Sequence, residues 1–174
     1  MLELFLWRHA KAVPAGGKLE DFERPLAARG HRDAALIAKW LAPRAATALV
    51  LCSPARRTRE TLDALVEELP QSCELRFERA LYLAPPERIA GALRALPETA
   101  RRVVVIGHNP GIHQLALALA LPAAQKRERA LEAGFPTAAL AQLQLHSERW
   151  ADFDRKPRTL LELVLPRELA AASD

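Results

Sequence analysis

The chain has 174 residues, half of them hydrophobic, with 25 Lys and Arg against 21 Asp and Glu and a formal net charge of +4. This length predicts a single domain over residues 1–174, because it is enough for one sizeable core and short for two. The basic residues are scattered and aromatic residues are few, which argues against a nucleic-acid-binding surface and favours an anionic substrate.

No apolar stretch is long enough to span a membrane, and the first residues have the pattern of a strand and lack that of a signal peptide. Cys52 and Cys73 make neither a metal-binding spacing nor a disulfide framework. The sequence therefore predicts a cytoplasmic protein with reduced thiols and no metal or other cofactor. We expect no membrane and no nucleic acid among its partners.

Apolar runs alternate with amphipathic stretches along the chain, which is the pattern of a layered α/β domain. The predicted strands are 2–7, 48–52, 74–77, 103–106, 138–145 and 159–165. The predicted helices are 30–41, 58–69, 86–96 and 111–120, each with an apolar side, and proline follows the first three.

The remaining segments complete this prediction. Residues 123–134 are charged and predict a loop or a surface helix, and residues 14–18 and 170–174 are expected to be mobile. The last two strands are separated by a polar run, which predicts an antiparallel pair. We therefore expect a three-layer α/β/α fold with a mixed, mostly parallel sheet.

An Arg-His pair, Arg8 and His9, stands at the end of the first predicted strand. In open α/β sheets, ligands bind outside the carboxyl ends of the strands. An imidazole nitrogen there can displace a phosphoryl group and form a phosphohistidine that water then hydrolyses. This requires that the attacking nitrogen be unprotonated while the other ring nitrogen is held by an acceptor. The sequence therefore predicts His9 as a nucleophile.

Arginines follow the second predicted strand, in Ser53-Pro54-Ala55-Arg56-Arg57. Arg8 and Arg57 can each present two parallel donors to phosphate oxygens and stabilise the charge of the transition state. Arg56 remains an alternative to Arg57, because the side chains of a helix start point in different directions. A basic helix start is unfavourable for the helix dipole unless an anion binds there, which favours a phosphate site.

A second histidine, His108, follows the apolar run that ends at Gly107. Asn109 and the residues after it open a helix whose amide groups can help to hold an anion. We expect His108 to donate a hydrogen bond to the transferring phosphoryl group. The other histidines lack such companions and are predicted to be structural or exposed: His31, His113 and His146.

Three motifs together resemble the histidine phosphatase superfamily, also called phosphoglycerate mutase-like. They are Leu6-Trp7-Arg8-His9-Ala10, Ser53-Pro54-Ala55-Arg56-Arg57 with Thr61, and Val105-Ile106-Gly107-His108-Asn109-Pro110. The resemblance implies that His9 is the nucleophile, that Arg8 and Arg57 clamp the phosphate, and that His108 is the second catalytic histidine. The short length, the Arg-His-Ala-Lys start and three further segments resemble the SixA-type phosphohistidine phosphatases. These segments are Asp21-Phe22-Glu23-Arg24-Pro25-Leu26, Arg29-Gly30 and Phe135-Pro136-Thr137. The same resemblance places Arg24 and Asn109 among the substrate-binding residues.

Larger members of this superfamily carry a glutamate general acid in a Leu-x-Glu setting, where this chain has Leu81-Tyr82-Leu83. General acid catalysis contributes about 10²–10⁴-fold, so its loss would handicap the cleavage of an unactivated phosphate ester. The P–N bond of phosphohistidine is weak once its nitrogen is protonated and can break without a strong acid. Glu78 and Glu87 remain alternatives as general acid.

The sequence therefore predicts a metal-independent phosphohistidine phosphatase that works through a phosphohistidine enzyme intermediate. Its expected partner is a histidine-phosphorylated protein, either a phosphotransfer domain or a phosphocarrier. Two alternatives stay open: a phosphomonoesterase of the same fold that takes a phosphorylated small molecule, and a non-catalytic phosphoprotein-binding module.

Overall fold

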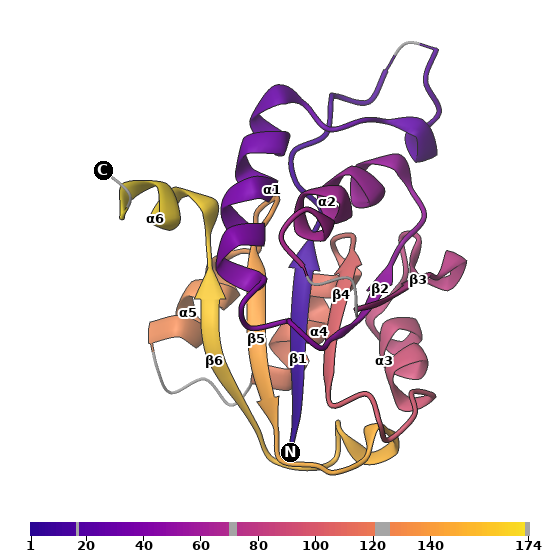
Figure 1. Ribbon diagram of the computed structural model, residues 1–174, viewed down its shortest axis with the longest axis vertical. Coiled ribbons are helices and arrows are strands. Elements are labelled where there is room, and N and C mark those ends of the chain that lie inside the picture. Colours follow the sequence, from indigo (N-terminus) through magenta and orange to yellow (C-terminus); the bar gives the residue numbers. More distant parts are fainter. Residues whose placement is uncertain (17, 70–72, 121–125, 173–174) are drawn as a thin grey trace.

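The computed structural model describes residues 1–16, 18–69, 73–120 and 126–172. A six-stranded sheet with the strand order β3-β2-β4-β1-β5-β6 forms its centre (Figure 1). The strands are β1 (Leu2–Arg8), β2 (Leu49–Cys52), β3 (Glu74–Phe77), β4 (Arg102–Gly107), β5 (Leu140–Leu145) and β6 (Arg158–Val164). The first four run parallel to one another, whereas β5 is antiparallel to both β1 and β6. The expected mixed, mostly parallel sheet is confirmed.

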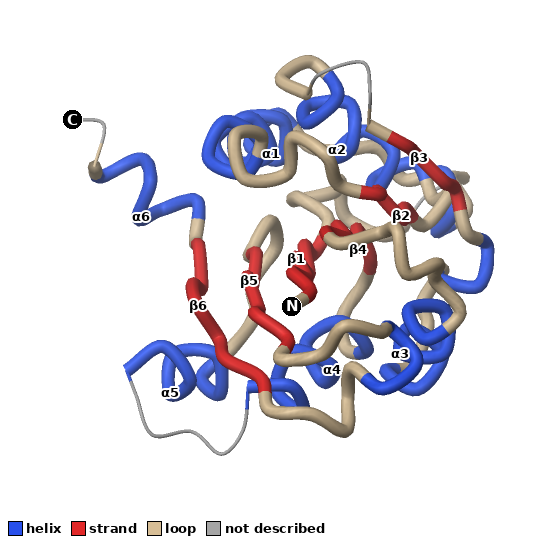
Figure 2. Tube along the Cα trace, turned by 60° about the horizontal axis from the view of Figure 1, so that its bottom comes forward, coloured by secondary structure: helices blue, strands red, loops and turns tan. Residues whose placement is uncertain are grey.

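Helices cover both faces of the sheet (Figure 2). On one side lie α1 (Ala28–Leu41), α2 (Arg56–Val66) and α6 (Pro166–Ala171), and on the other lie α3 (Pro86–Arg94), α4 (Gly111–Ala120) and α5 (Lys126–Ala133). Three short 3-10 helices complete the description: η1 (Asp21–Glu23), η2 (Arg79–Leu81) and η3 (Trp150–Asp152). The fold is the expected three-layer α/β/α arrangement.

The central strands alternate their side chains between two cores. Phe5 and Trp7 of β1 belong to the core beneath α1 and α2, whereas Leu4 and Leu6 belong to the core beneath α3 and α4. This alternation follows from the two-residue period of a strand, and because both faces are covered the strand is apolar throughout. Burial of such side chains contributes roughly 1.5–3 kcal/mol each.

Element ends differ from the predictions where the backbone departs from regular geometry. The helix predicted over 58–69 ends at Val66, and residues 67–69 form a turn; Pro70 lies outside the described residues. β5 begins two residues later than predicted because Ala138 adopts a left-handed φ of 62°, which an extended strand does not accommodate.

The terminal and charged segments gave the least sequence signal. Residues 126–133 of the charged segment form the helix α5, and residues 123–125 lie outside the described ranges. Residues 170 and 171, expected to be mobile, belong to α6, which the sequence analysis missed although Pro166 opens it. Residues 17, 173 and 174 of the two segments expected to be mobile also lie outside the described ranges.

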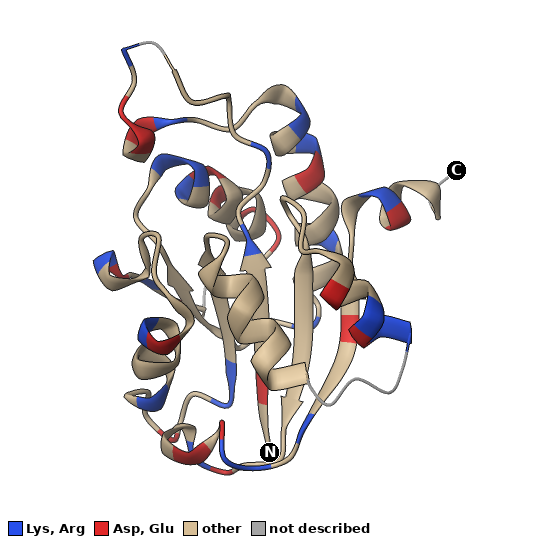
Figure 3. Cartoon of the chain, turned by 180° about the vertical axis from the view of Figure 1, so that it is seen from behind, with Lys and Arg blue, Asp and Glu red and all other residues tan. Residues whose placement is uncertain are grey.

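The position of β4 between β1 and β2 decides where the polar clusters meet. Because these three strands are parallel neighbours, their carboxyl ends lie side by side at one edge of the sheet. Basic and acidic residues are interspersed over the helices and loops (Figure 3). Within the described ranges, no helix has the length and apolar character that crossing a membrane requires.

Candidate active site

Two histidines meet at the carboxyl ends of β1 and β4. His9 directly follows β1 and His108 directly follows β4, and their ring centroids are 5.2 Å apart. Both side chains are buried, with 9% and 2% of their surface exposed, and Arg57 at the start of α2 is 3% exposed. The structure therefore brings together three residues that are separated along the chain by 48 positions, from His9 to Arg57, and by 51 positions, from Arg57 to His108.

The surroundings of His9 determine which of its ring nitrogens carries a hydrogen and whether the ring is charged. Its Nδ1 lies 2.8 Å from the carbonyl oxygen of Ala10, so Nδ1 carries the ring hydrogen and Nε2 has the free lone pair. Burial is the main cause that lowers the pKa of His9 to about 4; the bond to Ala10 acts against it, and the charges of Arg57, Arg8 and Arg24 act in the same direction as burial. A neutral imidazole with a free Nε2 is the form that can attack phosphorus.

Ser53 holds the second histidine. Its hydroxyl is 2.7 Å from Nε2 of His108, while the buried Nδ1 of His108 makes no hydrogen bond within the described part of the chain. With the hydroxyl as donor, Nδ1 carries the ring hydrogen and can donate to a phosphoryl oxygen. Burial, and then the neighbouring His9 and Arg57, lower the pKa of His108 to about 3, so the ring is neutral at pH 7.

Arg57 is the arginine of the second cluster that faces the site. Its Nη1 donates to the carbonyl oxygen of Asp21 at 2.6 Å, and its Nη2 donates to Oδ2 of Asp21 at 2.9 Å. Arg56 is exposed and pairs with Glu60, at 2.7 Å between Nε and Oε1. Of the two arginines, Arg57 is therefore the one placed at the candidate site, and it is also the one that the motif resemblance implies.

Asp21 is a residue of the candidate site to which the sequence analysis gave no role. Besides Arg57, it accepts hydrogen bonds from the hydroxyl of Tyr82 and from Nη1 of Arg24, both at 2.7 Å. The bond from Tyr82, with those from Arg24 and Arg57, holds the pKa of Asp21 well below its usual range. Asp21 is therefore an ionised carboxylate that orients the arginine and balances part of its charge. Asp21 belongs to a segment that took part in the motif resemblance, but only the fold shows that it contacts Arg57 and Tyr82.

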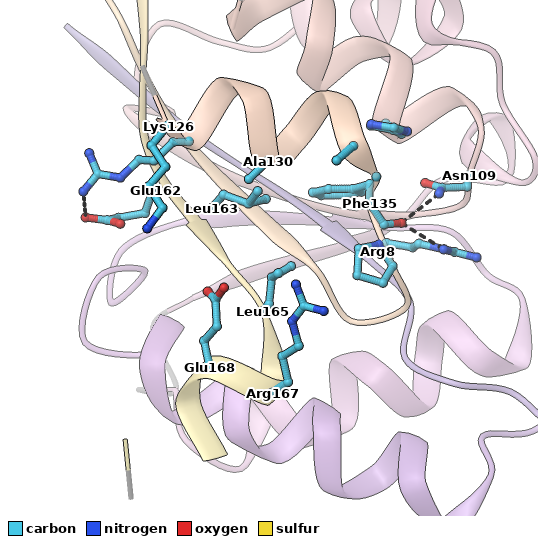
Figure 4. Close-up of a pocket in the computed structure, with 15 residues that line it drawn as sticks. Arg8, Asn109, Lys126, Ala130, Phe135, Glu162, Leu163, Leu165, Arg167 and Glu168 are labelled. Carbon is cyan, nitrogen blue, oxygen red and sulfur yellow. Dashed lines mark hydrogen bonds and ion pairs between the residues drawn. The ribbon is translucent and has the colours of Figure 1, made fainter. Parts of the chain in front are cut away.

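Arg8 and Asn109 lie on the other side of the site and share one acceptor (Figure 4). Nη1 of Arg8 and Nδ2 of Asn109 both donate to the carbonyl oxygen of Phe135, each at 2.9 Å. Nε of Arg8 and Oδ1 of Asn109 are buried without a partner among the described residues. A buried donor without a partner is costly, so the free Nε of Arg8 suits an anion.

A cleft of about 910 Å³ opens beside Arg8 and Asn109. It runs between α5 and the end of β6, and its charged lining residues come from both elements and from α6 (Figure 4). These are Lys126, Arg127, Glu162, Arg167 and Glu168. The phosphoryl site therefore adjoins a cleft with more basic than acidic groups.

Two aromatic side chains, Phe22 and Tyr82, form what we call the aromatic rim. The centroid of the Tyr82 ring lies 5.4 Å from that of His108 at an interplanar angle of 88°, and Phe22 lies 5.1 Å from Tyr82 at 73°. Arg57 lies 6.0 Å from the centre of the Tyr82 ring. Tyr82 is the one tyrosine of the chain. In the sequence it drew notice only because the Leu81-Tyr82-Leu83 segment stands where larger members of the superfamily have Leu-x-Glu.

Other candidates lie apart from these contacts. Arg24 donates to the carbonyl oxygen of Val13 and to Asp21, so it acts on the site through its charge and through Asp21. In the described part of the chain, Glu78 and Glu87 form no hydrogen bond or ion pair with the histidines or arginines of the site. The described residues also contain no group of three or more His, Cys, Asp or Glu side chains that could hold a metal ion.

Comparison with known proteins identifies the class to which this fold and site belong. The sequence model of the histidine phosphatase superfamily, branch 1, matches residues 4–82. An uncharacterized protein of Mycobacterium tuberculosis is 35% identical over 164 residues, covering 92% of this chain and 99% of that protein. The chain belongs to the histidine phosphatase superfamily, and it is a phosphatase.

Solved structures narrow the class further. A proposed phosphohistidine phosphatase SixA from Nakamurella multipartitia matches with a TM-score of 0.80 and 30% identity, over 95% of this chain and 96% of that one. A second, from Agrobacterium tumefaciens, matches with a TM-score of 0.76 and 28% identity, over 95% and 99%. The protein histidine phosphatase SixA in complex with tungstate shares the fold, with a TM-score of 0.75 and 24% identity, over 97% and 99%. Within the superfamily the chain is of the SixA type, as its motifs indicated.

Proposed function

We propose that this phosphatase removes phosphate from a phosphorylated histidine of another protein, with His9 as the nucleophile. The observation that carries the proposal is the protonation state of His9 and of Asp21. His9 is neutral with its Nε2 free, and the carboxylate at the site, Asp21, is held ionised. The site therefore contains a ready nucleophile beside a carboxylate that does not donate a proton.

In the first step, the lone pair of His9 Nε2 forms a bond to phosphorus while the bond from phosphorus to the substrate nitrogen breaks. The electron pair of that bond stays with the leaving imidazole, which is protonated from solvent. Water then attacks the phosphohistidine, releases inorganic phosphate and restores neutral His9. No metal ion takes part, since arginines balance the phosphoryl charge.

Arg8, Arg57 and His108 hold the phosphoryl group during this transfer. The free Nε of Arg8 and the free Nδ1 of His108 are buried donors that gain a partner when an anion binds. Arg57 retains further N–H groups beyond those bonded to Asp21, because a guanidinium has five. Such donors stabilise the charge that develops on the phosphoryl oxygens.

The ionised state of Asp21 favours a leaving group that needs no strong acid. A carboxyl group protonates an alkoxide only if its pKa is raised, and the pKa of Asp21 is lowered instead. Phosphohistidine meets this condition, whereas alkyl phosphate esters do not. The adjoining cleft, which offers basic side chains outside the site, supports a partner as large as a protein.

The test is a comparison of kcat/KM for a phosphohistidine carrier protein, free phosphohistidine and glycerol phosphate, in buffer with and without EDTA. We expect the two phosphohistidine substrates to react and glycerol phosphate to react at least about 10²-fold more slowly. Rapid quenching with radiolabelled substrate should trap label on wild-type protein.

Three results would overturn this proposal. Faster turnover of glycerol phosphate would favour the phosphomonoesterase, and binding without turnover would favour a phosphoprotein-binding module. Loss of activity in EDTA, restored by one divalent ion, would rule out the metal-free mechanism.

A further inference from the structure

The aromatic rim stands between the buried histidines and solvent. His108 is almost fully buried, whereas Tyr82 and Phe22 are each partly exposed. The ring of Tyr82 packs edge-on against His108, and Phe22 packs edge-on against Tyr82. The rings therefore form a continuous row from the phosphoryl site to the surface.

Polar contacts and backbone contacts fix the position of Tyr82. Its hydroxyl donates to Asp21, which is held in turn by Arg57. A side chain at Gly111 would place its Cβ 1.8 Å from the carbonyl oxygen of Ala84, so the loop that carries Tyr82 approaches α4 only because residue 111 is glycine. The adjacent Leu83 has a left-handed φ of 47°, a strained conformation that the surrounding contacts must maintain. The ring is thus preorganised without being part of the core.

The geometry of transfer directs the leaving group to this rim. In phosphoryl transfer the attacking and leaving atoms lie roughly in line through phosphorus. His9 and Tyr82 both contact the ring of His108, with centroid distances of 5.2 and 5.4 Å. If His9 attacks from the buried side, in-line transfer places the leaving atom on the opposite, more exposed side, and Tyr82 and Phe22 are the partly exposed rings beside His108.

We propose that Tyr82 and Phe22 form a subsite for the aromatic ring that carries the phosphoryl group. The inference rests on the proposed function, because it states which part of the leaving group is recognised. A flat imidazole packs against the aromatic rim, whereas an alkyl or unsubstituted carrier does not fill it. An aromatic pair of this kind should favour the ring-bearing substrate by about two- to tenfold.

Two P–N substrates isolate the contribution of the ring. Phosphoimidazole carries the ring, and phosphoramidate has the same type of bond without it. We would measure kcat/KM for both on wild type, Tyr82→Phe and Tyr82→Leu. Tyr82→Phe is the matched control, because both variants lose the hydroxyl that bonds to Asp21 and only Tyr82→Leu also loses the ring.

From Tyr82→Phe to Tyr82→Leu, the ratio of kcat/KM for phosphoimidazole to that for phosphoramidate should fall about two- to tenfold. Phe22→Leu should lower the same ratio by a smaller factor, with circular dichroism verifying the fold of each variant. An equal ratio in the two Tyr82 variants, or an equal loss on both substrates, would overturn the proposed subsite. Failure of the wild type to hydrolyse either compound would instead overturn the proposed function.

Discussion

The base of the site and its aromatic rim are built in different ways. The base consists of His9, Arg57 and His108, which are nearly fully buried and lie at or just after the ends of β1, β2 and β4. The rim consists of Phe22 and Tyr82, which are partly exposed and held by loops and by Asp21. In the proposed mechanism, residues near the strand ends react with phosphorus, and the proposed subsite for the leaving group lies on the loops. Changes at the base should therefore affect all substrates, and changes at the rim should affect selectivity.

The largest effect is expected from removal of the nucleophile at the base. His9→Ala should lower kcat by about 10⁴-fold or more on every substrate, because the other neutral imidazole of the site, His108, has its Nε2 bonded to the hydroxyl of Ser53. Rapid-quench labelling should detect no phosphoenzyme in this variant. His31→Ala is the control, since His31 is exposed at the surface of α1, away from the site. Label or turnover retained in His9→Ala would contradict the mechanism.

The second effect separates two adjacent arginines. Arg57→Ala should lower kcat/KM by about 10²–10³-fold, because it removes charge-assisted donors from the transferring group. Arg56→Ala should change it less than about twofold, since Arg56 is exposed and pairs with Glu60. Steady-state kinetics on phosphoramidate measures both. A larger loss in Arg56→Ala would reverse the assignment.

The third effect concerns the stability of the base. The folded-state pKa values of His9 and His108 are about 4 and about 3, below the unfolded value of about 6.5. At pH values between the folded-state and unfolded-state pKa, the unfolded chain therefore binds more protons than the folded chain does. The free energy of unfolding should consequently fall as pH drops from 7 towards 4. We expect a loss of a few kcal/mol between pH 7 and 5 in urea titrations. The variant with both His9→Gln and His108→Gln should lose most of this dependence; an unchanged slope would contradict it.

The fourth effect displaces the rim and leaves the nucleophile in place. Gly111→Ala should destabilise the fold by about 1–3 kcal/mol, because its methyl group collides with the carbonyl oxygen of Ala84. Gly91→Ala is the matched control: it lies within α3 with open space around it, and it should gain about 0.5–1 kcal/mol. Thermal unfolding of the two variants measures the difference. Equal melting temperatures would mean that the loop after η2 adapts freely.

The smallest effect tests the carboxylate that joins the rim to the base. Asp21→Asn keeps the size of the side chain but removes a negative charge beside Arg57. Inorganic phosphate should then inhibit about three- to tenfold more strongly, because a like charge next to the anion is gone. Inhibition constants at constant ionic strength measure this. An unchanged inhibition constant would mean that Asp21 orients Arg57 but does not weaken phosphate binding through its charge.

The sequence predicted the base better than the rim. His9 and His108 follow strands whose apolar runs are unmistakable, and the general behaviour of α/β sheets directs such residues to one edge. The resemblance of the Ser53-Pro54 and Thr61 motif implied Arg57 and left Arg56 as an alternative, and the bonds of Arg57 to Asp21 were not predicted. The contact between Tyr82 and Asp21 joins two loops 61 residues apart, and no local pattern of residues encodes it. Its geometry depends on loop conformations such as the left-handed Leu83.

The place of β4 in the sheet has a consequence for how the molecule assembles. β1 and β2 both pair with β4 and do not pair with each other. The strand that lies between them, β4, therefore follows both of them in the sequence. The first 82 residues, which carry the proposed nucleophile and the two arginines proposed to bind phosphate, contain β1, β2 and β3, and in them β1 and β2 lack their common neighbour. We therefore expect the site residues to come together only when the segment up to His108 has folded and β4 has paired with both β1 and β2, in one cooperative step.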